Sequence, residues 1–138
     1  MLALWVCFAC ITFSLPSHAK QEGDIAAARI VITDQIAAFR RDDSAAAYAH
    51  ASPTVRTVFP SPAVFMEMVR TGYPAVYRPQ HYSFEPARWR DDGRLLQPVR
   101  IEWSDGDPLI AVYILAKQPD GSWKIDGVFL SRDDRIAA

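Results

Sequence analysis

The sequence predicts a single α+β domain in which N-terminal helices pack on a curved antiparallel sheet. Apolar residues recur at helical spacing in the first half of the chain, whereas apolar and polar residues alternate in the second half. Asp120 and Gly121 form an Asp-Gly pair between two apolar stretches, a pattern typical of a hairpin. The 138 residues give room for one domain with a sizeable core. Helices that precede antiparallel strands are expected to gather on one face of the sheet.

Residues 1–19 differ from the rest of the chain. An uncharged apolar run from Leu2 to Leu15 is followed by small residues at the last and third-last positions before a polar segment. This arrangement is typical of a secretory signal peptide and predicts cleavage after Ala19. We therefore expect one periplasmic or secreted domain at residues 20–138. Because the apolar run is short for a membrane span, no stable membrane anchor is expected after processing.

Net charge and cysteine content exclude several classes of function. The formal net charge is −1, so we expect no binding to nucleic acid. Cys7 and Cys10 both lie in the predicted signal peptide, which leaves the mature domain without cysteine for disulfides or metal sites. His50 and His81 are isolated in the sequence, and no glycine-rich phosphate loop occurs. The sequence predicts neither a metal site nor a cofactor.

The first helix is predicted to begin at Asp24, whose carboxylate is suited to an N-cap. Apolar residues within 25–39 form one stripe of this helix, and a short Ala-rich helix follows at 45–51. Ser-Pro pairs at Ser52 and Ser61 predict two further helix starts, because proline fits the first helical position. In the last of these helices the side chains expected to point inward are Val64, Phe65, Met68 and Val69.

The sheet is predicted to have four strands in meander order. Two prolines within 73–79 indicate a stiff, extended connection that leads into it. The first strand, at about 80–89, contains Pro86 and is therefore expected at an edge. The third strand, at 109–116, is apolar on both faces, so one apolar face would remain after the helices cover the other. A homodimer through this outer sheet face is the expected consequence.

The fourth strand follows the Asp-Gly turn and alternates in character. Trp123, Ile125 and Phe129 are expected on one face, toward the core, with Asp126 on the opposite face. This placement directs the Asp126 carboxylate away from any internal cavity. We therefore predict no catalytic residue.

Five residues are candidates for binding a ligand. Tyr73, Tyr77 and Arg78 lie within one short segment, where two amphipathic rings and a planar cation can close an apolar cavity and leave a polar group at its mouth. Trp103 on the second strand and Tyr113 on the third complete the set.

Several segments resemble a bacterial family of unknown function numbered 4864. They are residues 51–53, 65–70, 72–74, 76–79, 97–99 and 121–127. The closing hairpin is also similar to that of many cone-shaped α+β domains of the cystatin-like and nuclear-transport-factor-two-like class. The resemblance implies such a cone and an exported protein, but no particular reaction.

Two functions of different class remain open at this point. The first is a non-enzymatic exported domain that binds a small apolar ligand between helices and sheet, or a protein partner in the cell envelope. The alternative is a small isomerase- or cyclase-like enzyme with an acid–base residue in the cavity of the cone.

Overall fold

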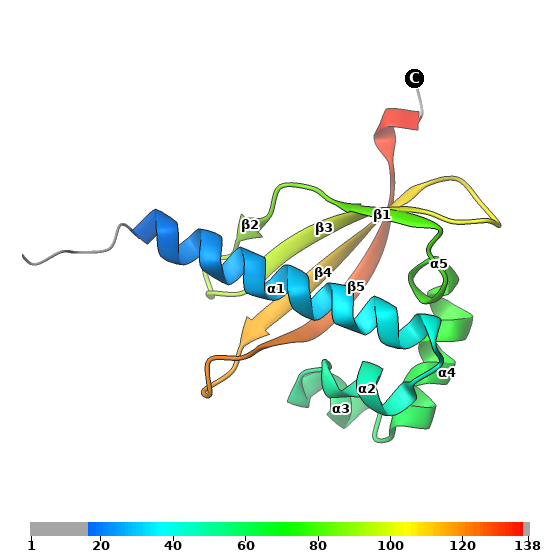
Figure 1. The fold of residues 1–138 in the computed structure, drawn as a ribbon, viewed down its shortest axis with the longest axis horizontal. Helices are drawn as coiled ribbons and strands as arrows, with labels where there is room; N and C mark the ends of the chain where they lie inside the picture. Colours follow the sequence, from blue (N-terminus) through cyan, green and yellow to red (C-terminus); the bar gives the residue numbers. More distant parts are fainter. Residues whose placement is uncertain (1–16, 137–138) are drawn as a thin grey trace, which may run out of the picture.

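The structure, a computed structural model, describes residues 17–136 of the chain. Helices come first and strands follow, and Figure 1 shows helix α1 (Ser17–Arg40) lying across the sheet. The predicted α+β architecture is therefore confirmed. Most of the predicted signal peptide, residues 1–16, lies outside the described residues. Within residues 17–136, no helix is long and apolar enough to cross a membrane.

Helix α1 is the longest helix among the described residues and supplies one wall of the core. The prediction that it begins at Asp24 is wrong, because the helix is already formed at Ser17. The Asp24 carboxylate accepts a hydrogen bond from Lys117 Nζ at 3.2 Å instead of capping the helix. The apolar stripe on α1 is confirmed, and its fully buried members are Ala28, Ile32, Ile36 and Phe39.

Three short helices follow, and the starts of the second and third agree with the predicted Ser-Pro pairs. They are α2 (Ser44–Ala49), α3 (Pro53–Val58) and α4 (Pro62–Gly72). The hydroxyl of Ser52 accepts from Val55 N at 3.3 Å, and that of Ser61 accepts from Val64 N at 3.2 Å. In α4 the prediction of an inward Val64 is wrong, since this side chain is 48% exposed. Phe65 and Val69 are buried as expected.

The connection at residues 73–79 is not extended. It contains a short helix α5 (Pro74–Tyr77), with Pro74 at its first position. Proline at the first helical position loses no hydrogen bond, so the residue that seemed to exclude a helix begins one. The prediction of an extended segment is wrong for this reason.

The sheet has five strands rather than the predicted four. They are β1 (His81–Phe84), β2 (Arg88–Trp89), β3 (Leu95–Glu102), β4 (Leu109–Lys117) and β5 (Trp123–Arg132). The antiparallel order is β1-β3-β4-β5, and β2 also pairs with β3. The predicted first strand is split because Pro86 cannot donate to the ladder. The Glu85 carbonyl beside this break accepts instead from Gln97 Nε2 at 2.7 Å.

A β-bulge in β5 changes which side chains face the core. Leu115 lies opposite Ile125, but the next residue of β4, Ile114, lies opposite Gly127. Asp126 is therefore an extra residue on β5, and the alternation of faces shifts by one beyond it. The prediction that Phe129 faces the core is wrong, because its side chain is 48% exposed.

The second apolar face of β4 is the face turned away from the core. The partly exposed side chains on this face are Ile110, Val112 and Ile114 of β4. Their apolar neighbours on β3 are Leu96 and Pro98. Strand β4 is thus apolar on both faces, as predicted. The homodimer that this face led us to expect stays a prediction.

Candidate functional site

An apolar cavity of about 260 Å³ lies between the helices and the bulged part of β5. Its walls come from α1, the 51–59 segment that contains α3, the end of α4, α5 and β5. The apolar lining residues are Phe39, Ala51, Val55, Val58, Phe59, Met68, Val69, Val76, Ile125 and Val128. Phe39 and Val69 belong to the buried core, whereas Val58 is 65% exposed. The cavity therefore runs from the core to the surface beside α3.

One charged side chain lines this cavity. The bulge brings Asp126 to the same side of β5 as Ile125, so both residues border the cavity. The Asp126 side chain is only 15% exposed. Its Oδ1 accepts from Ser52 Oγ at 2.8 Å, and its Oδ2 accepts from Arg94 Nη1 at 2.9 Å. The prediction that Asp126 points away from the cavity is wrong, because the bulge reverses the facing that strict alternation would give.

Arg94 is itself fixed by a second carboxylate. Asp92 lies on the turn between β2 and β3 and accepts from Arg94 Nε at 2.9 Å. These contacts lower the pKa of Asp92 and raise the pKa of Arg94 relative to their ordinary values, chiefly through the hydrogen bond that the two share. The turn thus holds the guanidinium in place against Asp126.

The remaining polar lining groups are uncharged or weakly acidic. Gln35 of α1 is 2% exposed, and its Nε2 donates to the Ala47 carbonyl at 3.1 Å. This bond uses one of the two N–H groups of the amide and leaves the second N–H and the carbonyl oxygen without a side-chain partner among the described residues. Thr54 and Tyr73 add hydroxyl groups, which can donate or accept.

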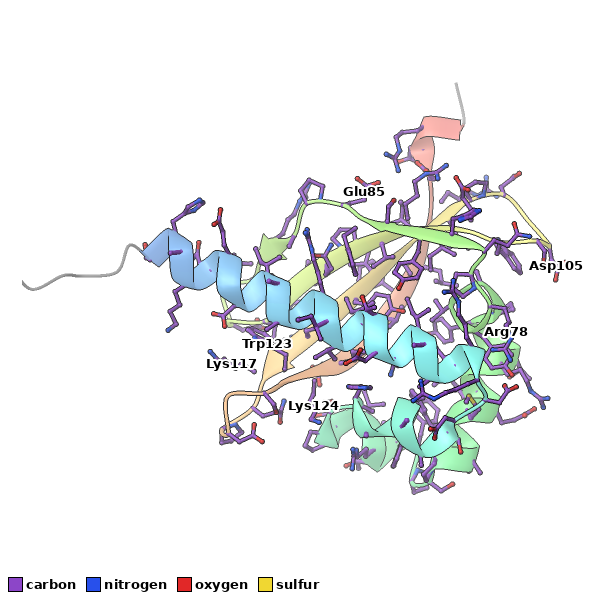
Figure 2. The ribbon with its side chains drawn as sticks, viewed as in Figure 1. Arg78, Glu85, Asp105, Lys117, Trp123 and Lys124 are labelled. Carbon is purple, nitrogen blue, oxygen red and sulfur yellow. The ribbon has the colours of Figure 1, made fainter. Side chains whose placement is uncertain are left out.

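Of the predicted ligand-binding residues, only Tyr73 is among those that line the cavity. Tyr77 and Arg78 instead form a cluster with Asp42 at the C-terminal end of α1. Arg78 Nη2 lies 2.9 Å from Asp42 Oδ1, its Nη1 donates to the Phe39 carbonyl, and its guanidinium lies 3.9 Å from the centre of the Tyr77 ring. Figure 2 shows Arg78 near this end of α1, far along the helix from Trp123.

The members of the Arg78 cluster shift one another's pKa values through their hydrogen bonds. The hydrogen bond from the Tyr77 hydroxyl, followed by that from Arg78, lowers the pKa of Asp42. The same contact with Asp42 raises the pKa of Tyr77. All three side chains are thus engaged with one another, in addition to the bond from Arg78 to the last turn of α1.

Trp103 and Tyr113 also lie apart from the cavity. Trp103 Nε1 donates to the Asp107 carbonyl at 3.0 Å in the β3–β4 loop. Tyr113 is fully buried on β4, and within the described part of the chain its hydroxyl has no hydrogen-bond partner. Burial raises the pKa of this hydroxyl. Tyr113 is therefore a core residue.

The isolated histidines do not form a metal centre among residues 17–136, where no group of three or more potential ligands occurs. His50 lies at the C-terminal end of α2, and burial lowers its pKa. His81 begins β1. The structure brings neither residue to the cavity lining.

A family model described as a domain of unknown function (DUF4864) matches residues 21–138. The match covers most of the chain and includes all of the residues that line the cavity. No curated protein and no solved structure matches the sequence.

Proposed function

The chain belongs to the DUF4864 family, whose description assigns no activity, and we propose that it binds a small, largely apolar molecule in the cavity beside β5. The observation that carries this proposal is an apolar space of about 260 Å³ that begins in the core and opens beside α3. An apolar cavity of about 150 Å³ is already large enough to hold benzene. A molecule with one or two rings, or a short aliphatic chain, therefore suits this site.

We further propose that the helices and sheet form a cone of the cystatin-like or nuclear-transport-factor-two-like class. The cavity position supports this proposal, since its walls come from α1 on one side and from β5 on the other. In such an arrangement a ligand enters between the helices and the sheet. The partly exposed Val58 marks the entrance.

Binding is favoured over catalysis by the contacts of Asp126. An acid–base enzyme needs a group that exchanges a proton with its substrate. Asp126 is the only carboxylate among the described residues that line the cavity, and each of its oxygens already accepts a hydrogen bond from Ser52 or Arg94. These bonds suit the Asp126 carboxylate to the role of a fixed hydrogen-bond acceptor and not to that of a group that transfers protons.

Naphthalene is expected to bind the processed protein in this cavity. Val58→Trp is expected to weaken that binding by about tenfold or more, because a large ring at the entrance fills the space that naphthalene needs. Fluorescence titration of naphthalene measures the dissociation constants. The matched control is Val64→Trp on α4, an exposed valine that does not line the cavity. No saturable binding to the wild type, or equal losses in both variants, would contradict the proposal.

We also propose export of the domain, supported by the apolar run and small residues that precede Lys20. N-terminal sequencing of the protein recovered from the periplasm or medium is expected to begin at Lys20. Ala19→Leu is expected to block processing, because the cleavage site requires a small residue, whereas Ala26→Leu is not. Recovery of the intact chain from the cytosol alone would count against export.

A further inference from the structure

We propose that the cavity selects uncharged apolar molecules that carry a hydroxyl or N–H group, and that Asp126 accepts the hydrogen bond from this group. The inference rests on the proposed function and specifies the chemical class of the ligand. It begins from the bulge in β5, which adds Asp126 opposite the Leu115–Ile114 step of β4. Bulges commonly redirect a side chain toward a site. Here the redirected side chain is the one carboxylate among the described residues of the cavity lining.

The Asp126 carboxylate is fixed but not fully used. Ser52 Oγ lies 2.8 Å from one oxygen and Arg94 Nη1 lies 2.9 Å from the other. An ionised carboxylate can accept about four hydrogen bonds through its two oxygens. One further acceptor position therefore remains on each oxygen. Because Ser52 is only 2% exposed and caps α3, the carboxylate cannot turn away from the cavity without breaking these contacts.

The surroundings of the carboxylate determine which donor it prefers. An apolar ligand that fills the cavity removes water from the free acceptor positions, and a buried acceptor without a partner is unfavourable. A ligand hydroxyl or N–H group replaces that water. Arg94 contacts both Asp126 and Asp92, and Arg90 Nε lies 3.4 Å from Asp92, so two guanidinium groups balance the two carboxylates. An added ammonium group would therefore gain little and would lose its own hydration. A neutral donor is therefore favoured over a cation.

The other polar lining groups agree with this preference. One N–H of Gln35 is engaged with the Ala47 carbonyl, and the amide retains its carbonyl oxygen, which can accept from a ligand donor, and a second N–H. Thr54 and Tyr73 hydroxyls can act either way and do not oppose a donor. Asp126 is thus the lining group that requires a hydrogen-bond donor on the ligand, and the other polar lining groups are compatible with one.

Three probes of similar size separate this inference from simple apolar binding. They are naphthalene, 1-naphthol, which carries a hydroxyl donor, and 1-methoxynaphthalene, in which that donor is methylated. We expect the wild-type protein at pH 7 to bind 1-naphthol about tenfold more tightly than 1-methoxynaphthalene, the ratio that one hydrogen bond of ordinary net strength provides. Asp126→Asn is expected to reduce this ratio to about threefold or less, because an amide oxygen is a weaker acceptor than a carboxylate.

The matched control is Asp42→Asn, which alters a carboxylate that binds a different arginine, Arg78, and does not line the cavity. This variant is expected to keep the tenfold ratio. If none of the probes binds the wild type, the proposed function itself fails. If naphthalene binds but the wild type does not prefer 1-naphthol, or if Asp126→Asn keeps the preference, only the assignment of the donor to Asp126 is overturned. The ratio of the two dissociation constants in the wild type shows whether a donor is preferred, even if a variant fails to fold.

Discussion

Trp123→Ala is expected to lower the free energy of unfolding by about 3–5 kcal/mol, the range observed when a large buried aromatic site is emptied. Trp123 follows the Asp-Gly turn, is 5% exposed, and packs with its ring centre 5.9 Å from that of Trp89. Its Nε1 also lies 3.4 Å from the Asp24 carboxylate of α1. Removal of the ring therefore leaves a space between β2, β5 and the first helix. Urea unfolding followed by circular dichroism measures the loss.

The control for this measurement is Phe129→Ala on the same strand. Strict alternation would place Phe129 on the face of Trp123, but the bulge turns it outward to 48% exposure. Its truncation is therefore expected to cost less than about 1 kcal/mol. Equal losses of unfolding free energy for the two substitutions would show that Phe129 faces the core like Trp123 and that β5 has no bulge.

The parts of the fold that could be predicted depend on local signals. The caps at Ser52 and Ser61 and the turn at Gly121, where φ is 85°, are each decided by a few neighbouring residues. The stripe of α1 and the double apolar pattern of β4 are periodic over several turns or residues. Such patterns determine which segments are helices and strands, and in what order.

The errors arise where the same residues permit two local structures. Pro74 can break a helix or begin one, and here the neighbouring α4 and α1 give α5 something to pack against. The side chain of Asp24 suits a helix cap, but its carboxylate accepts instead from Lys117 of β4 and Trp123 of β5. Both outcomes depend on partners far away in the sequence.

The candidate site was missed for a related reason. A bulge depends on the register of two strands, and the sequence of β5 alone does not contain that register. Without the bulge, strict alternation places the Asp126 side chain on the other face of the sheet from Ile125. The cavity would then have no charged group. The aspartate-glycine pair at Asp126 and Gly127 is the one local signal of an irregularity, because glycine within a strand often marks a bulge.

The second large effect on the free energy of unfolding is expected at two buried polar side chains in the core. Gln97 on β3 and Tyr113 on β4 are directly paired across the sheet, and both are fully buried. Both polar atoms of the Gln97 side chain have partners: Oε1 accepts from Arg29 Nε at 2.9 Å, and Nε2 donates to the Glu85 carbonyl at 2.7 Å and to the Pro98 carbonyl at 2.8 Å. The hydroxyl of Tyr113 has no partner among the described residues. Neighbouring buried polar groups therefore differ in whether their hydrogen bonds are made.

Gln97→Leu is expected to lower the free energy of unfolding by about 3 kcal/mol, because it leaves Arg29 Nε without its acceptor and removes one donor each from the Glu85 and Pro98 carbonyls. Tyr113→Phe is expected to raise the free energy of unfolding by about 1 kcal/mol. The substitution removes a buried hydroxyl that has no hydrogen-bond partner among the described residues, and burying such a group is unfavourable. Urea denaturation of both variants under one set of conditions gives the two signs. A stabilised Gln97→Leu protein would show that the Arg29 and Glu85 contacts contribute nothing. A destabilised Tyr113→Phe protein would mean that the Tyr113 hydroxyl has a partner in solution, such as a buried water.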